Sequence, residues 1–122
     1  MTRARVTLGE IGENLACEEL VRRGYAIVAR RYRRRGGEID IIALDGSTVV
    51  FVEVKARAGG EYGTGADAIT WRKRARIVAL ATSFLVRERL LERPVRFDVV
   101  SVDLADDGPR IEVYQGAFDA SS

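Results

Sequence analysis

Residues 37–57 read GEIDIIALDGSTVVFVEVKAR, and this stretch decides how the rest of the chain is arranged. Two runs rich in β-branched residues flank an Asp-Gly dipeptide, which favours a tight turn, so the pattern predicts a β-hairpin. Its unusual feature is the position of its charges. Asp40 interrupts the first apolar run, while Glu53 and Lys55 interrupt the second.

The register of this hairpin decides which charges meet. Side chains alternate between the faces of a strand, so Glu53 and Lys55 share a face. A four-residue loop places Asp40 opposite Glu53, and a two-residue loop places it diagonally; both put Asp40 on the charged face. A three-residue loop puts Asp40 on the other face. Carboxylates about 5 Å apart repel unless a proton or cation lies between them, and Mg²⁺ prefers such oxygen ligands.

A simpler interpretation is a solvent-facing hairpin surface on which Glu53 and Lys55 form an ordinary ion pair. It fits this sequence less well, because Val50, Val52 and Val54 occupy one face while further apolar residues share the charged face. Both faces are therefore expected to be covered. Carboxylates under partial cover require a partner or a function.

Length and composition predict one domain over residues 1–122, with residues 1–7 and 116–122 expected to be loose. One cysteine excludes an internal disulfide and suits a reducing cytoplasm, where we expect the protein to reside. The chain has no histidine, which excludes His-based catalysis, and one cysteine alone cannot build a zinc site. No stretch is long or apolar enough to predict a membrane span.

The net charge is a mild +2, but the charges are segregated, since residues 22–35 hold seven arginines and no acid. Fixed cations around an aromatic residue favour binding to nucleic acid. The alternative is a basic strand edge that prevents aggregation. The residues expected to contact nucleic acid are Arg30, Arg31, Arg33, Arg34, Arg35, Arg57, Arg72 and Lys73.

Apolar periodicity and turn residues predict the element order α-β-β-β-α-β-β, a mixed α/β sheet flanked by helices. The expected helices cover residues 9–23 and 68–91, and the expected strands cover 25–32, both arms of the hairpin, 95–104 and 110–114. A Gly-rich loop, residues 58–68, is expected at the mouth of the site, with Asp67 capping the second helix.

Two acids outside the hairpin interrupt apolar faces. Glu13 falls in the apolar sector that Ala16, Cys17, Leu20 and Val21 form on the first helix. It is either stabilised by the helix dipole or directed toward the metal or an attacking water. Asp98 interrupts one face of the strand over residues 95–104; it is expected to be structural and paired with an arginine, and a role in the site is the alternative.

Four short motifs also occur in a characteristic order: Gly9-x-x-Gly12-Glu13, Gly37-Glu38-Ile39-Asp40, Phe51-Val52-Glu53-Val54-Lys55-x-Arg57 and Arg96-Phe97-Asp98-Val99-Val100. An Asp followed by Glu-x-Lys in the next strand resembles the PD-(D/E)xK nuclease signature. The full order, over roughly residues 9–102, resembles the YraN family of small bacterial proteins, whose fold is similar to that of archaeal Holliday-junction resolvases.

The resemblance implies a restriction-endonuclease-like α-β-β-β-α-β core and a nuclease site. It implies Asp40 and Glu53 as ligands of Mg²⁺ or Mn²⁺, with Lys55 and Glu13 completing the catalytic set. In the similar nucleases a residue at the position of Lys73 contacts the substrate phosphate; a solvent-facing helix surface is the alternative. Resolvase-like action on branched DNA also implies a homodimer, because a junction needs two symmetric sites.

Three functions remain open. The first is metal-dependent hydrolysis of phosphodiester bonds, with branched or structured DNA as the expected substrate. The second is a nucleic-acid-binding protein that keeps the nuclease fold without useful catalysis. The third is a protein-interaction module.

Overall fold

We analysed a computed structural model of the protein, which describes residues 7–59 and 69–120. The elements follow the predicted order. They are α1 (Leu8–Arg22), β1 (Ala26–Arg34), β2 (Gly37–Asp45), β3 (Thr48–Ala58), α2 (Trp71–Arg87), β4 (Val95–Ala105) and β5 (Gly108–Phe118). Within the described residues no helix is long and apolar enough to cross a membrane.

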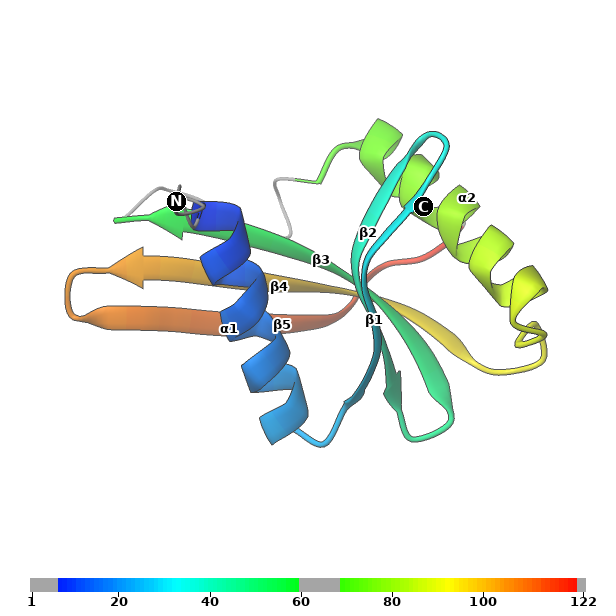
Figure 1. Cartoon of the computed structure of the whole chain (residues 1–122), viewed down its shortest axis with the longest axis horizontal. Coiled ribbons are helices and arrows are strands. Elements are labelled where there is room, and N and C mark those ends of the chain that lie inside the picture. The colour runs from blue at the N-terminus through cyan, green and yellow to red at the C-terminus, as the bar shows by residue number, and fades with distance from the viewer. Residues whose placement is uncertain (1–6, 60–68, 121–122) are drawn as a thin grey trace, which may run out of the picture.

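The strands form one mixed sheet whose spatial order, β1-β2-β3-β4-β5, is also their order along the chain (Figure 1). Three of the pairings are antiparallel, and β3 pairs with β4 in parallel. A parallel pair requires a crossover connection, and α2 lies in that connection. The α/β class and the mixed sheet predicted from the sequence are therefore confirmed.

The central hairpin has the register of the longer predicted loop. Leu44 pairs with Val49, as a four-residue loop requires, and the pairing continues to Asp45 and Thr48 around a tight turn. Gly46 occupies this turn with φ 61°, a left-handed conformation that glycine adopts without strain. Continued by one residue beyond the pair of Ile41 and Val52, the same register places Asp40 of β2 opposite Glu53 of β3.

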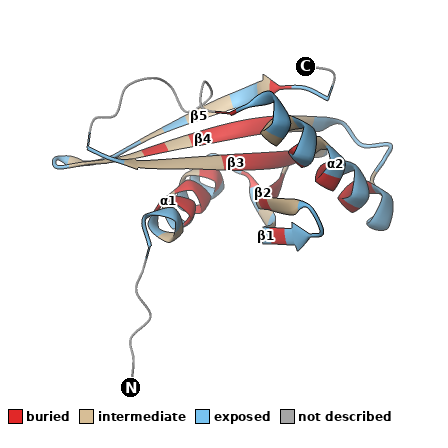
Figure 2. Cartoon of the chain, turned by 90° about the horizontal axis from the view of Figure 1, so that it is seen from above, coloured by how far each residue is buried: buried red, intermediate tan, exposed pale blue. Residues whose placement is uncertain are grey.

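Both faces of the hairpin are covered, as predicted, and burial is concentrated where the helices meet the sheet (Figure 2). Helix α2 packs on the face that carries Val49 and Phe51. Helix α1 packs on the opposite face, which carries Val50 and Val52. The central β2–β3 hairpin therefore lies between the two helices, which explains why both of its faces are mainly apolar.

Several predicted details are wrong. Val21 was expected in the apolar sector of α1, but its side chain is 56% exposed. The chain from Gly116 was expected to be loose, yet β5 continues to Phe118, which is buried against Phe97 in a stacked ring pair. Helix α2 is shorter than expected, and Thr70 caps it by accepting the backbone N–H of Lys73. Asp67, the predicted cap, lies outside the described residues.

Candidate functional site

Asp40 and Glu53 come together where β2 separates from β3. The ladder pairing of the two strands ends at Ile41 and Val52. Beyond that point the Asp40 carboxylate accepts the backbone N–H of Val54 at 2.8 Å, so the side chain takes over a bond of the strand ladder. Asp40 is also within hydrogen-bonding reach of the Glu53 carboxyl group. The backbone therefore fixes one carboxylate beside the other.

These two acids line a small cavity of about 210 Å³ between strands β2 and β3 and helix α2, which we call the acidic cavity. Its lining includes Glu38, Asp40, Glu53, Lys73, Arg76 and Leu80. The Glu53 side chain is only 5% exposed. A buried carboxylate needs a compensating positive charge, and the cationic side chains that line the same cavity can supply it.

The environment raises the pKa of Asp40 from 3.8 to about 7. Burial is the largest cause, and the charge of Glu53 is the second. The Val54 N–H bond and the charge of Lys73 act in the opposite direction without cancelling the rise. The folded protein therefore keeps Asp40 protonated up to about neutral pH, which relieves the repulsion between the two carboxyl groups.

Lys73 supplies a cation to this pair, a contact that sequence reasoning missed. Its Nζ lies 2.5 Å from Oε1 of Glu53. Thr70 caps the first turn of α2 and so fixes the start of the helix that carries Lys73. A signal was available, because Lys73 precedes the buried Ile77 by four residues and Leu80 by seven. That spacing puts all three on the face of α2 that meets the sheet.

Glu13 lies on the other side of Asp40. It is buried, as predicted, and it accepts hydrogen bonds from Arg30 at 3.1 Å and Arg31 at 3.4 Å. A close approach of α1 to β3 brings it there, since a Cβ on Gly12 would lie 2.5 Å from Cβ of Ala56. Glycine is therefore required at residue 12 if α1 is to lie this close to the strand.

Glu13 and Asp40 share a larger and more open concavity of about 580 Å³, which we call the basic groove. Its lining includes Glu13, Arg31, Arg33, Asp40, Lys55 and Arg57. Lys55 thus joins Asp40 in the groove, while Glu53 lines the acidic cavity instead. Asp40 lines both concavities, so it lies between Glu53 in the acidic cavity and Glu13 and Lys55 in the basic groove.

The arginines that follow Tyr32 lie at the end of the β1–β2 hairpin. Arg33, Arg34 and Arg35 are exposed, and the Arg34 guanidinium lies 4.4 Å from the centre of the Tyr32 ring. The hairpin end packs on α2 at Gly37, where a Cβ would lie 3.5 Å from the Arg76 side chain. The hairpin end and the cationic first turns of α2 therefore lie side by side, and Lys73 and Arg76 of α2 line the acidic cavity.

Among residues 7–59 and 69–120, no three His, Cys, Asp or Glu side chains lie close enough together to form a metal cluster. Asp40 and Glu53 alone remain a suitable pair for a hard divalent ion, because both offer carboxylate oxygens. The raised pKa of Asp40 means that burial and the charge of Glu53 disfavour the ionised form of this carboxyl group. The two residues of the pair therefore fit Mg²⁺ or Mn²⁺ with the remaining ligands supplied by water or substrate.

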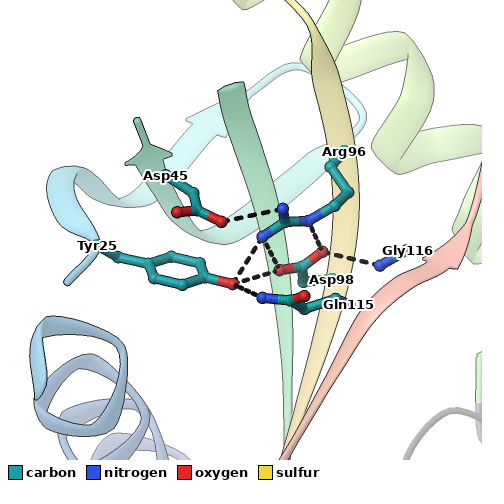
Figure 3. Close-up of polar contacts among 6 residues, drawn as sticks. All are labelled: Tyr25, Asp45, Arg96, Asp98, Gln115 and Gly116. Atoms are coloured by element: carbon teal, nitrogen blue, oxygen red, sulfur yellow. Dashed lines mark hydrogen bonds and ion pairs between the residues drawn. The ribbon is translucent and has the colours of Figure 1, made fainter. Parts of the chain in front are cut away.

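A third buried acid, Asp98, belongs to a structural network near the turn of the central β2–β3 hairpin (Figure 3). Its oxygens accept two bonds from Arg96, at 2.8 and 3.0 Å, and one from the Tyr25 hydroxyl at 3.1 Å. The backbone N–H of Gly116 donates a further bond, and Arg96 also reaches Asp45. The contacts agree with the predicted structural role and the predicted arginine partner.

Comparison with known proteins gives one consistent result. The family described as "Uncharacterised protein family UPF0102" matches residues 12–102. A UPF0102 protein of Symbiobacterium thermophilum is 48% identical over 114 residues, which cover 93% of this chain and 97% of that protein. UPF0102 proteins of Geobacter metallireducens and Pseudomonas aeruginosa are each 45% identical, over 93% and 92% of this chain. The matched region contains every residue of the acidic cavity, and the chain belongs to the UPF0102 family.

Proposed function

We propose that the protein is a metal-dependent nuclease that hydrolyses phosphodiester bonds in nucleic acid, with structured DNA as the expected substrate. The observation that carries the proposal is the pair of the half-buried Asp40 and the buried Glu53, in which the pKa of Asp40 is raised to about 7. Two neighbouring carboxylates destabilise the fold, and such pairs are expected at sites that bind a cation. The resemblance of Asp40, Glu53 and Lys55 to the PD-(D/E)xK signature supports the same assignment.

In the proposed site, Asp40 and Glu53 hold the metal. A bound Mg²⁺ or Mn²⁺ would polarise the phosphate and lower the pKa of an attacking water. Lys55, which lines the basic groove together with Asp40, would orient that water or donate to a phosphate oxygen. Val54, whose N–H is bonded to Asp40, keeps the Asp40 carboxylate from rotating away.

The arginines of the basic groove would hold the substrate backbone. Glu13 bonds Arg30 and Arg31, so its proposed contribution is to position these two cations beside Asp40. The side chains of Arg30 and Arg31 remain 40% and 43% exposed, which leaves them accessible to phosphate oxygens. Arg33 and Arg57 line the same groove and extend the positive surface. Contacts of this kind carry little sequence information, so we expect cleavage to depend on DNA structure.

One observation favours a second function, nucleic-acid binding without catalysis. The protein's own side chains already contact two of the acids, Lys73 at Glu53 and two arginines at Glu13. A site that is satisfied in this way could keep its fold and its basic groove without ever binding a metal. The two functions differ in whether divalent ions bind at Asp40.

The deciding experiment is a cleavage assay on labelled branched, flapped, single-stranded and duplex DNA with Mg²⁺ or Mn²⁺. We expect the wild-type protein to cut at least one branched substrate, while Asp40→Asn and Glu53→Gln lose cleavage and retain DNA binding. Lys55→Ala should lose cleavage but keep metal binding, because its proposed contact is with water and phosphate. DNA binding with no metal-dependent cleavage of any substrate would favour the second function. A branched substrate offers two symmetric sites, so we also propose a homodimer, which light scattering of the protein–DNA complex would test.

A further inference from the structure

The contact between Lys73 and Glu53 joins two residues of very different exposure. Glu53 is almost fully buried, whereas the Lys73 side chain lines the same cavity and is 42% exposed. Lysine has a flexible stem of four carbons. Its ammonium group can therefore leave Glu53 by rotation of the side chain, while helix α2 stays in place.

We propose that Lys73 is an internal counter-ion that competes with the divalent metal for Glu53 and is withdrawn by the phosphates of bound nucleic acid. This inference rests on the proposed function, because it assumes that Asp40 and Glu53 bind a metal. It goes beyond that function in giving metal binding and nucleic-acid binding a shared control. Each would strengthen the other.

Competition follows from the position of the ammonium group. Nζ lies 2.5 Å from Oε1 of Glu53. A divalent ion bound to that oxygen would have to approach it about as closely. Two cations on one buried carboxylate repel strongly, since the surroundings screen them less than water does. The metal therefore has to displace Lys73, and the free energy of the ion pair is subtracted from the free energy of metal binding.

Coupling follows from where Lys73 can go when it leaves. Arg76 lines the same cavity as Lys73, and the exposed Arg72 lies one helical turn before Arg76 on α2. A phosphate attracted by these cations offers Lys73 a second anionic partner close to the first. Nucleic acid would then release Glu53 for the metal, and by thermodynamic linkage the metal would raise the affinity for nucleic acid by the same factor.

The test is a calorimetric titration of Ca²⁺, a hard ion used here as the probe, into wild-type protein and Lys73→Met. Arg72→Met is the matched control in the absence of nucleic acid, because it removes the same charge one residue away without touching Glu53. We expect Lys73→Met to bind Ca²⁺ about tenfold more tightly than wild type, and Arg72→Met to change affinity about twofold or less. If a melting curve shows that Lys73→Met is not folded, Lys73→Gln replaces it in the titration.

A second titration contains a single-stranded oligonucleotide. It should raise the Ca²⁺ affinity of the wild-type protein several-fold, and it should raise that of Lys73→Met distinctly less. Calcium affinity in Lys73→Met equal to or weaker than wild type, with binding still abolished by Asp40→Asn, would overturn the counter-ion and leave the proposed metal site standing. An equal oligonucleotide effect in both proteins would overturn the coupling. Absence of binding in every variant would overturn the proposed function together with this inference.

Discussion

Replacing Asp40 by Asn should make the metal-free protein more stable at high pH and leave it nearly unchanged at low pH. The pKa of Asp40 is raised from 3.8 to about 7 in the folded protein. Between these two values the folded state retains a proton that the unfolded state has lost. The free energy of unfolding of the wild type therefore falls as pH rises from about 4 to about 7, and it levels off above that.

The magnitude can be worked from the same pKa values. A pKa difference of about 3, at about 1.36 kcal/mol for each, sets an upper limit of about 4 kcal/mol. Water entry and side-chain relaxation around a half-buried carboxylate should reduce this to about 2 kcal/mol. Asparagine carries no charge and can still accept the Val54 N–H bond. For a chain of this size the gain corresponds to about 8 °C in melting temperature.

The assay is thermal unfolding of both proteins in EDTA at pH 4, 6 and 8. The difference in melting temperature should be small at pH 4 and should reach its full value by pH 8. Glu38→Gln is the control, because Glu38 lines the same cavity with a side chain that is 33% exposed, and its removal should change stability little at any of these pH values. A difference that does not vary with pH, or an Asp40→Asn protein that is less stable at pH 8, would refute the reasoning.

Other predictions address the groove, the packing of α1 and the structural network. Replacing the three arginines of residues 33–35 by Gln should weaken DNA binding and flatten its salt dependence, measured by fluorescence anisotropy at several salt concentrations, because fewer counterions are released. Gly12→Ala should cost about 1–3 kcal/mol in chemical denaturation, and adding Ala56→Gly should restore part of the loss, since the clash is between their Cβ atoms. Asp98→Ala should cost about 3–5 kcal/mol, because it leaves buried partners unpaired. Single-stranded DNA should quench the fluorescence of Trp71, the one tryptophan in the chain, which is 67% exposed beside the basic turn of α2.

The hairpin and its two covered faces could be predicted because they depend on alternation within a short stretch of sequence. Once the register is known, the approach of Asp40 to Glu53 follows from strand geometry alone. The burial of Glu13 followed in the same way from its position on α1. In each case the deciding residues belong to one element or to two adjacent ones.

The partners of the acids could not be predicted with the same certainty. The bonds of Glu13 to Arg30 and Arg31 join α1 to β1, and the contact of Glu53 with Lys73 joins β3 to α2. Long cationic side chains reach several ångströms in many directions, and the sequence pattern describes only the element on which they begin. Neither interpretation of the arginines, nucleic-acid binding or a basic strand edge, gives Arg30 and Arg31 an acidic partner within the protein, yet both bond Glu13.

The end of β5 was mispredicted for a related reason. Residues after Gly116 have no strong strand pattern of their own. Phe118 is held by stacking on Phe97 of β4, a contact between residues that are distant in sequence. Tertiary packing thus extended a strand where local propensity predicted a loose end.

The agreement between strand order and chain order has a consequence for synthesis of the protein. Helix α1 and strands β1 to β3 leave the ribosome before α2 and β4 have been made. During that interval β3 is an edge strand, and the run from Val49 to Val52 that the finished protein buries has no parallel partner. An unpaired apolar edge of this kind readily joins the edge of another chain. Nascent or truncated chains that stop between β3 and β4 should therefore be the aggregating species of this protein, and chaperone demand should end when β4 is added.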